Sequence, residues 1–300
     1  MHIFITGATG LIGSHLCQQL LAEHQLTVLS RSPDTATQLL GAGILAVDSL
    51  ANVDFNTVDC VINLAGEPIV NKRWSDKQKQ RLLDSRIVLT QQISTAIQYS
   101  QTPPHTFISG SAIGFYGRQD NTLIDESFTA VHPEFSHKLC EAWEQAAFAA
   151  QSANTRVCTL RTGIVLAKQA GALAKMLPPF KLGLGGPIGN GEQGMSWIHI
   201  DDMVRLILFV LETKNLSGAI NATAPNPVSN KEFSHQLGQA LARPAFIPMP
   251  SLLLKLVMGE MADLLLYGQF VLPKKVLLQQ FSFTYPTLPQ ALKQLVNQSA

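Results

Sequence analysis

The sequence predicts an α/β fold: a Rossmann-like, doubly wound parallel sheet with a smaller, mainly helical C-terminal domain. Three observations support this fold class. A glycine-rich turn separates the first apolar run from an apolar-periodic helix. Short β-branched runs then alternate with longer amphipathic segments through the first half of the 300 residues. From Asn226 onward the pattern is helical and interrupted by prolines, which indicates a separate unit.

The opening residues predict the first strand, turn and helix. Residues 2–5 are apolar, three glycines follow, and apolar residues at helical spacing then extend to Leu21. The first glycine permits the tight turn, the second lets the backbone approach a phosphate, and the third lets helix and strand pack closely. Because a second strand at 26–30 completes a βαβ unit, the pattern favours a pyrophosphate site over a purely structural turn. The residues expected to contact the cofactor here are Thr6, Gly7, Thr9, Gly10, Leu11, Ile12 and Gly13.

The remaining elements continue this alternation. We expect strands at 43–47, 58–64, 106–109 and 157–161, and helices at 75–99, with Ser75 as N-cap, and 134–151. A loop at 183–194 is followed by strands at 197–200 and 219–222, a helix at 201–212, a strand-like segment at 281–285 and a helix from Leu288. We assign residues 1–170 plus about 196–225 to the dinucleotide-binding domain, and about 171–195 and 226–300 to a substrate or C-terminal domain.

Composition excludes several classes of partner. The net charge is +1 with no basic block, so neither nucleic acid nor an anionic membrane is expected as a main partner. The four cysteines are scattered without metal-ligand spacing, which indicates reduced thiols and no metal site. Residues 252–272 contain three charges and predict an amphipathic or core helix rather than a membrane span. The first apolar run is short and lacks a basic leader, so we expect a cytoplasmic protein.

The end of the second predicted strand bears on the choice of cofactor. Dinucleotide folds place an acidic residue there to bind a ribose 2′-hydroxyl, and an arginine to hold a 2′-phosphate. Arg31 occupies this position, and no carboxylate precedes Asp34. The sequence therefore favours NADP over NAD, with a solvated surface arginine as the alternative. Asp48, after the third strand, is expected near the adenine, and Leu64, Ala65 and Gly66 are expected to lie along the cofactor.

Several motifs together resemble the extended short-chain dehydrogenase/reductase superfamily, which holds NAD(P)-dependent epimerases, dehydratases and reductases. They are TGATGLIG (6–13), NLAG (63–66), SGSAIGFYG (109–117), RTGIVL (161–166) and GNGEQGMSWIHIDDM (189–203). NLAGEPI (63–69), KRW (72–74), MLPPFKLGLGGPIGNG (176–191) and LPKKVL (272–277) are similar to its epimerase/dehydratase-like subgroup of the YfcH type, which has its own C-terminal domain. The resemblance covers nearly the whole chain. It also implies that Ser109, Gly163 and Val165 lie beside the nicotinamide.

The catalytic trio of that superfamily is a serine or threonine, a tyrosine and a lysine in Tyr-x-x-x-Lys. Ser111 and Lys138 match two members, but Glu134 stands where the tyrosine is expected. A glutamate with an ordinary pKa of ~4.3 is a poor proton donor at neutral pH, whereas burial would raise the pKa of its carboxyl and allow donation. The alternative is a plain Glu134–Lys138 pair on one helix face. Tyr116 is a second candidate phenol, with a half-buried structural role as its alternative.

Three further residues could meet substrate. Glu67 opens the loop after the fourth strand and could bind substrate or cap the next helix. Arg73 and Arg86 could bind an anionic substrate, or could belong to a solvated face. The resemblance also implies pairing of two copies through the helices expected at 75–99 and 134–151.

Two functions remain open on the sequence. The first is an NADP(H)-binding oxidoreductase or epimerase acting on a carbonyl or nucleotide-sugar-like substrate. The second is a non-catalytic NADP(H)-binding or redox-sensing protein, which the glutamate at position 134 favours and the serine at position 111 opposes.

Overall fold

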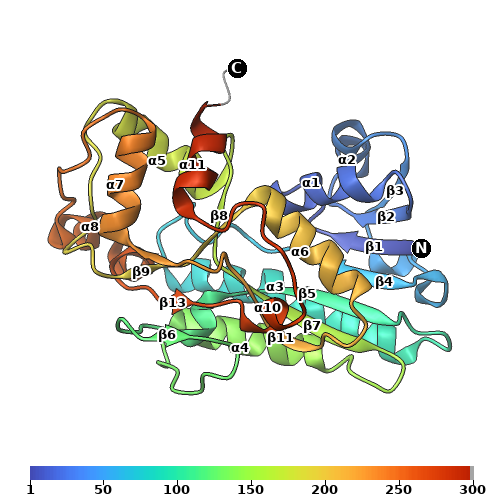
Figure 1. Ribbon diagram of the computed structural model, residues 1–300. Helices are drawn as coiled ribbons and strands as arrows, with labels where there is room; N and C mark the ends of the chain where they lie inside the picture. Colours follow the sequence, from blue (N-terminus) through green and yellow to red (C-terminus); the bar gives the residue numbers. More distant parts are fainter. Residues whose placement is uncertain (298–300) are drawn as a thin grey trace.

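A seven-stranded sheet forms the centre of the computed structural model, which describes residues 1–297 (Figure 1). All six strand pairings in this sheet are parallel. The order across the sheet is β11 (Gly218–Ala222), β7 (Arg156–Thr162), β5 (Thr106–Ala112), β4 (Cys60–Asn63), β1 (His2–Thr6), β2 (Gln25–Leu29) and β3 (Ile44–Val47). The chain therefore winds outward in both directions from β1 and β4, and the predicted fold class is confirmed.

Helices cover both faces of this sheet because its strands are apolar on both sides. Ile3 and Ile5 of β1 pack in one apolar cluster with α1 (Leu11–Leu20) and α6 (Ile200–Glu212). Phe4, between them, points to the opposite face and packs in a second cluster with α3 (Asp76–Tyr99) and α4 (Phe135–Phe148). The helix α2 (Pro33–Leu40) packs beside β3. Ser75 caps α3 as expected, since its side chain accepts a hydrogen bond from the Gln78 amide.

The C-terminal part forms a second lobe with its own apolar cluster. Trp197, Phe233 and Leu292 are buried in it. Its helices are α5 (Gly171–Lys181), α7 (Asn230–Ala240), α8 (Ser251–Met258), α9 (Asp263–Leu266) and α11 (Leu288–Asn297), whereas α10 (Lys274–Leu278) packs against β11 of the large sheet. This separate cluster is consistent with the two domains expected from the sequence, whose boundaries stay a prediction.

Three two-stranded pairings lie outside the large sheet, and the last of them joins the C-terminal part to the first half of the chain. They are β8 (Ile164–Leu166) with β10 (Trp197–His199), β9 (Gly194–Met195) with β12 (Val228–Ser229), and β6 (Leu123–Ile124) with β13 (Phe270–Val271). Single turns of 3₁₀-helix lie at η1 (Leu50–Asn52), η2 (Phe55–Thr57), η3 (Ile113–Tyr116) and η4 (Gly259–Ala262).

Two sequence-based assignments are wrong. Residues 252–272 do not form one helix: α8 ends at Met258, because the next residue, Gly259, has φ of +61°, and η4, α9 and β13 follow. Residues 281–285 form no strand, because a side chain rather than a neighbouring strand satisfies their backbone. The buried Asp202 carboxylate accepts hydrogen bonds from the Thr284 and Tyr285 amides, each at 2.8 Å. No helix within residues 1–297 is long and apolar enough to cross a membrane.

The Asp202 contacts predict a large loss of stability on substitution. Asp202→Asn replaces one acceptor oxygen with a donor that faces backbone N–H groups, so we expect the free energy of unfolding to fall by about 2–3 kcal/mol. Asp201→Asn is the matched control: that side chain is 50% exposed, and we expect a change below about 1 kcal/mol. Urea denaturation of both variants measures the difference. Equal losses would show that these two backbone contacts do not stabilise the fold.

Candidate functional site

The carboxyl ends of β1 and β4 meet where the strand order reverses, and the glycine turn lies at this point. Gly7 has φ of +71°, and a Cβ atom there would lie 2.6 Å from the carbonyl carbon and oxygen of Leu64. A Cβ on Gly13 would lie 2.3 Å from the Gly7 oxygen. Only glycine therefore fits at either position. The first-turn N–H groups of any helix lack intrahelical acceptors. In α1 the N-cap residue is Gly10, which has no side chain to accept a hydrogen bond from them.

Buried hydrogen bonds hold the turn against the loop after β4. The Thr6 hydroxyl donates to Asn63 Oδ1 at 2.6 Å, and the Ala65 amide donates to Thr6 Oγ1 at 3.3 Å. The Asn63 amide group donates in turn to the Thr90 hydroxyl on α3, at 2.8 Å. These contacts hold the glycine turn and the loop after β4 in place relative to each other. Both segments are expected to line the cofactor site, and the first N–H groups of α1 are directed at the space between them.

A hollow of about 670 Å³ opens at the carboxyl ends of β2 and β3. Leu29 lines it from β2, Asp48 and Leu50 line it after β3, and Leu89 lines it from α3. Arg31 follows two residues after Leu29 and is exposed. The hollow is thus in the place where the sequence predicts the adenine end of a dinucleotide, and its mixed polar and apolar lining suits a base.

The other end of the same edge contains the residues expected beside a nicotinamide. Gly163 follows β7, and a Cβ there would lie 2.5 Å from the Ser196 carbonyl oxygen. Ser109 is buried in β5, and Val165 is half-buried in β8. The α5 helix begins at Gly171, where an added Cβ would lie 3.1 Å from the Leu11 side chain of the glycine turn. The predicted cofactor residues therefore surround one strip of the sheet edge.

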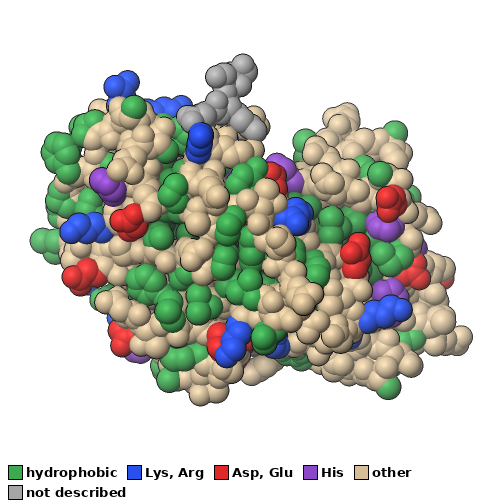
Figure 2. Space-filling view, viewed as in Figure 1, with side chains coloured by type: hydrophobic (Ala, Val, Ile, Leu, Met, Phe, Trp, Pro, Cys, Tyr) green, Lys and Arg blue, Asp and Glu red, His purple; other side chains and the backbone are tan. Residues whose placement is uncertain are grey.

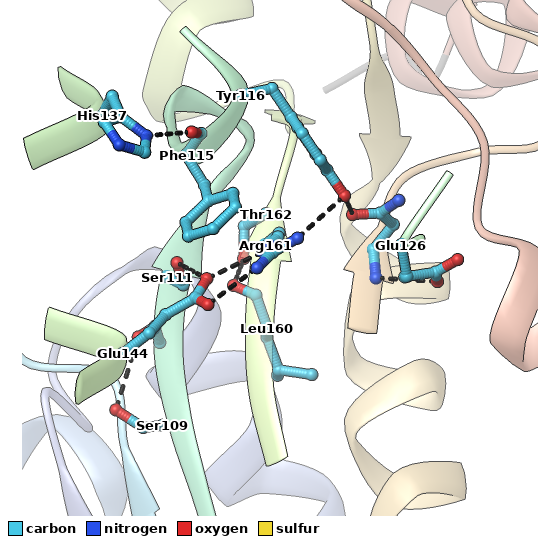
Figure 3. A network of polar contacts seen from close by, with 12 residues as sticks. Ser109, Ser111, Phe115, Tyr116, Glu126, His137, Glu144, Leu160, Arg161 and Thr162 are labelled. Atoms are coloured by element: carbon cyan, nitrogen blue, oxygen red, sulfur yellow. Dashed lines mark hydrogen bonds and ion pairs between the residues drawn. The ribbon is translucent and has the colours of Figure 1, made fainter. Parts of the chain in front are cut away.

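Ser111 belongs to a buried polar network (Figure 3), and its hydrogen-bond partner there is neither Glu134 nor Lys138. Its hydroxyl donates to Glu144 Oε1 at 2.7 Å. Arg161 binds the same carboxylate with two donors, Nε to Oε1 at 2.8 Å and Nη2 to Oε2 at 2.9 Å. All three side chains are buried. Burial alone lowers the pKa of the Arg161 guanidinium, but the Glu144 carboxylate raises it overall, so the guanidinium stays charged. Neither Glu144 nor Arg161 was among the expected site residues, since nothing near them in the sequence indicates that they pair.

Tyr116 is fully buried at the end of the same network. Its hydroxyl donates to Asn221 Oδ1 at 2.8 Å and accepts from Arg161 Nη1 at 3.1 Å. Burial raises the pKa of the phenol, and the nearby guanidinium offsets this only in part. A phenol that exchanges protons near neutral pH needs the opposite shift. This geometry therefore argues for a structural Tyr116 and against its expected role as a proton carrier.

Glu134 has a different partner from the one expected. Its carboxylate accepts from Arg118 Nε at 2.8 Å and from the Ser136 hydroxyl at 2.8 Å. Among the ion pairs of residues 1–297 there is none with Lys138, which is exposed. The expected i, i+4 pair is wrong because Glu134 is the extended N-cap residue of α4, with ψ of −178°, and does not lie on the helix face. Arg118 also binds Asp263 of α9 at 2.5 Å.

The loop after β4 contains the expected substrate residues. Arg86 Nη2 donates to the Glu67 carbonyl at 3.0 Å, and burial lowers the pKa of this guanidinium. Arg86 thus supports the loop backbone, and its side chain is not free for a ligand. The Glu67 amide donates to Ser85 Oγ at 3.0 Å, whereas Ser75 caps the next helix, so the capping role considered for Glu67 is wrong. Arg73 is exposed and lies against Gly259 of the C-terminal lobe.

The described residues offer no ready metal or thiol site. No group of three His, Cys, Asp or Glu side chains within residues 1–297 could hold a metal ion. All four cysteines are free and buried. Burial raises the pKa of Cys17 to about 11 and that of Cys140 to about 12, so neither thiol ionises readily at neutral pH.

The burial of the Glu144–Arg161 pair predicts how it responds to substitution. Arg161→Met leaves an uncompensated buried carboxylate, and we expect the free energy of unfolding to fall by about 3–5 kcal/mol. Arg118 also pairs with two carboxylates but is 36% exposed, so Arg118→Met is the matched control, with an expected loss of at most about 1 kcal/mol. Urea denaturation measures both losses. The double variant Glu144→Gln, Arg161→Met should recover part of the loss, and equal effects of the two arginine variants would contradict the assignment.

Comparison with known proteins identifies the family. The NAD dependent epimerase/dehydratase family model matches residues 3–222, and the domain of unknown function DUF1731 matches residues 249–295. The chain is 38% identical to the Arabidopsis thaliana chloroplastic homolog of epimerase family protein SDR39U1, over 99% of this chain and 87% of that protein. It is 37% identical to the Homo sapiens SDR39U1 protein, over 99% of this chain and 100% of that one.

Solved structures give the same result. The crystal structure of human SDR39U1 (isoform2) with NADPH matches with a TM-score of 0.92 and 36% identity, covering 100% of both chains. A Bacillus cereus UDP-glucuronic acid 4-epimerase, solved with UDP-glucuronic acid and NAD, has a TM-score of 0.78 at 23% identity, covering 99% of this chain and 98% of that one, and shows the shared fold alone. The chain belongs to the NAD dependent epimerase/dehydratase family, as its motifs predict, and has a DUF1731 domain in its C-terminal part.

Proposed function

We propose that this protein binds NADPH along the carboxyl edge of its sheet and is an oxidoreductase or epimerase acting on a small carbonyl or nucleotide-sugar-like substrate. The observation that carries the proposal is the glycine turn at the point where the strand order reverses, with room only for hydrogen at Gly7 and Gly13. The human relative solved with NADPH, similar over the whole chain, supports the choice of cofactor.

The residues of the chain fit a dinucleotide. The N–H groups of Leu11, Ile12 and Gly13 begin α1 and would bind the pyrophosphate. The exposed Arg31 would hold the 2′-phosphate, and the hollow that Asp48 lines would take the adenine. When bound, the nicotinamide supplies hydride chemistry. Ser109, Gly163 and Val165 would bound its ring, as Leu64, Ala65 and Gly66 would bound the middle of the cofactor.

The hydrogen bond of Ser111 limits what it can offer a substrate. Its proton is already donated to Glu144, so its oxygen is left as an acceptor. Ser111 would therefore hold a substrate hydroxyl rather than a substrate carbonyl. Glu134 would exchange a proton only after leaving Arg118, and Lys138 is exposed. An anionic substrate would meet Arg73, which is exposed, and the half-exposed Glu67 would border it.

A second candidate is a non-catalytic NADP(H)-binding protein that senses redox state. The observation that favours it is that Tyr116, Glu134 and Ser111 all have protein partners. Incubation with NADP⁺ or NADPH and a panel of UDP-sugars distinguishes the two candidates, with product analysis for epimers and absorbance for the nicotinamide. Turnover that Ser111→Ala reduces supports the enzyme. Tight NADPH binding without turnover on any of the panel supports the sensor.

Two other expectations stay proposals. Pairing of two copies through α3 and α4 would cover Val88, which is exposed on α3. A cytoplasmic location is still expected from the sequence, although the Arabidopsis relative is named as chloroplastic.

Cofactor preference gives the direct test. We expect wild-type protein to bind NADPH at least about tenfold more tightly than NADH, because Arg31 would form charge-assisted hydrogen bonds with the 2′-phosphate only. Arg31→Ala should remove that preference and leave NADH binding unchanged. Fluorescence titration of both nucleotides measures it, with Arg243→Ala, also exposed, as the control that should behave as wild type.

The outcomes separate the two parts of the proposal. Equal binding of NADPH and NADH by the wild type would overturn the role of Arg31 and leave the cofactor site itself in place. Binding of neither nucleotide would overturn the proposed function.

A further inference from the structure

An exposed apolar surface lies on the C-terminal lobe, apart from the cofactor site. On α8, Leu252, Leu256 and Val257 are 80%, 74% and 65% exposed, and Leu253 is 48% exposed. Their spacing places them on one stripe of the helix, while Leu254 points into the lobe and is buried. Side chains of this size are normally covered, so this stripe has the properties of a binding surface.

The stripe continues onto two adjoining segments. Residues 243–250 lead into α8, and Phe246 there is 74% exposed. Residues 182–189 run beside them: the Ile247 amide donates to the Gly185 carbonyl at 3.2 Å, and the Met249 amide to the Pro187 carbonyl at 2.8 Å. Leu182 and Leu184 on this neighbour are 74% and 61% exposed. We call the exposed apolar residues of 182–184 and 246–257 the α8 surface. In Figure 2, hydrophobic side chains stand at the outer edge of the lobe where Figure 1 places α8.

Basic residues predominate in the two segments that form the α8 surface. Residues 176–191 and 243–258 contain Lys181, Arg243 and Lys255 and not one Asp or Glu, although the whole chain has 21 acidic and 22 basic residues. Of the first acids after the two segments, Glu260 pairs with Lys79 at 2.5 Å, whereas Glu192 accepts only from the neutral Asn190 amide, at 2.8 Å. A ligand that is apolar where it meets the leucines and negatively charged near the three cations would complement this surface.

We propose that the α8 surface binds peripherally to an anionic lipid bilayer. An apolar helical stripe with Phe and Leu, bordered by lysine and arginine, inserts at the boundary between headgroups and acyl chains. The cations then lie at the level of the anionic headgroups. A second copy of the chain fits less well, because a twofold contact would place the same cations opposite one another without acids between them. Composition predicts no membrane partner because the net charge of the whole chain is only +1, and the basic residues of these two segments are too few to change it.

Co-sedimentation of the full chain with vesicles tests the proposal. We expect binding to phosphatidylcholine vesicles that contain phosphatidylglycerol, weaker binding to pure phosphatidylcholine, and loss of the difference at high salt. Leu252→Ser with Leu256→Ser should weaken binding at least about tenfold, because two inserted side chains are lost. Lys255→Glu should weaken it by about tenfold through charge alone.

A matched control and the opposing outcomes complete the design. Leu278→Ser changes a leucine that is 71% exposed on α10, near two lysines but outside the α8 surface, and should bind vesicles as wild type does. Thermal melting and NADPH titration of each variant show that the fold and cofactor site are intact. Absence of binding to the anionic vesicles overturns the proposal. A dimer in solution that the double leucine variant converts to monomer also overturns it, in favour of a second copy.

Discussion

The close approach of the turn after β1 to the loop after β4 is the constraint on which the rest of the site depends. At Gly7 the space that a side chain would need is filled by the Leu64 carbonyl, so the two segments touch through backbone alone. The hydrogen bonds of Thr6 with Asn63 and of Asn63 with Thr90 connect this contact to α3, and the Trp143 indole of α4 donates to the same Thr90 oxygen at 3.0 Å. Both helices on one face of the sheet are therefore connected to this contact by hydrogen bonds.

The buried Glu144–Arg161 pair imposes a second constraint, on chemistry rather than shape. A buried ion pair is costly unless its remaining donors and acceptors are satisfied, and here Ser111, Tyr116 and the two-point fork satisfy them. In the same network the Ser111 hydroxyl donates its hydrogen bond to Glu144, and the Tyr116 hydroxyl is bonded to Asn221 and Arg161. In this fold the polar groups beside the expected nicotinamide therefore serve first to neutralise an internal charge, which leaves few of them free to exchange protons with a substrate.

The features that can be predicted from the sequence are those that depend on residues close together in the chain. The sequence predicts the strands of the large sheet, the glycine turn and the Ser75 cap, because each depends on residues within a few positions of one another. The segment 281–285 was misjudged because its backbone partner, Asp202, lies about eighty positions away. Likewise, Glu134 pairs with Arg118 rather than with Lys138. The sequence does not predict this pair, because the loop that brings Arg118 to the N-terminus of α4 has no periodic pattern.

The contacts that join the two lobes differ in kind from one part of the boundary to another. Near the sheet the connection is a buried one: the Ser196 hydroxyl donates to the Gln269 carbonyl at 2.8 Å and accepts from the Val271 amide at 2.8 Å. At the edge formed by η4 and α9 the connection consists of the partly exposed pairs Lys79–Glu260 and Arg118–Asp263. Exposed ion pairs contribute at most about 1 kcal/mol each, whereas separating close-packed backbone exposes unpaired polar groups. The contacts between the lobes are therefore weaker at η4 and α9, where Arg73 and Arg118 lie, than near the sheet.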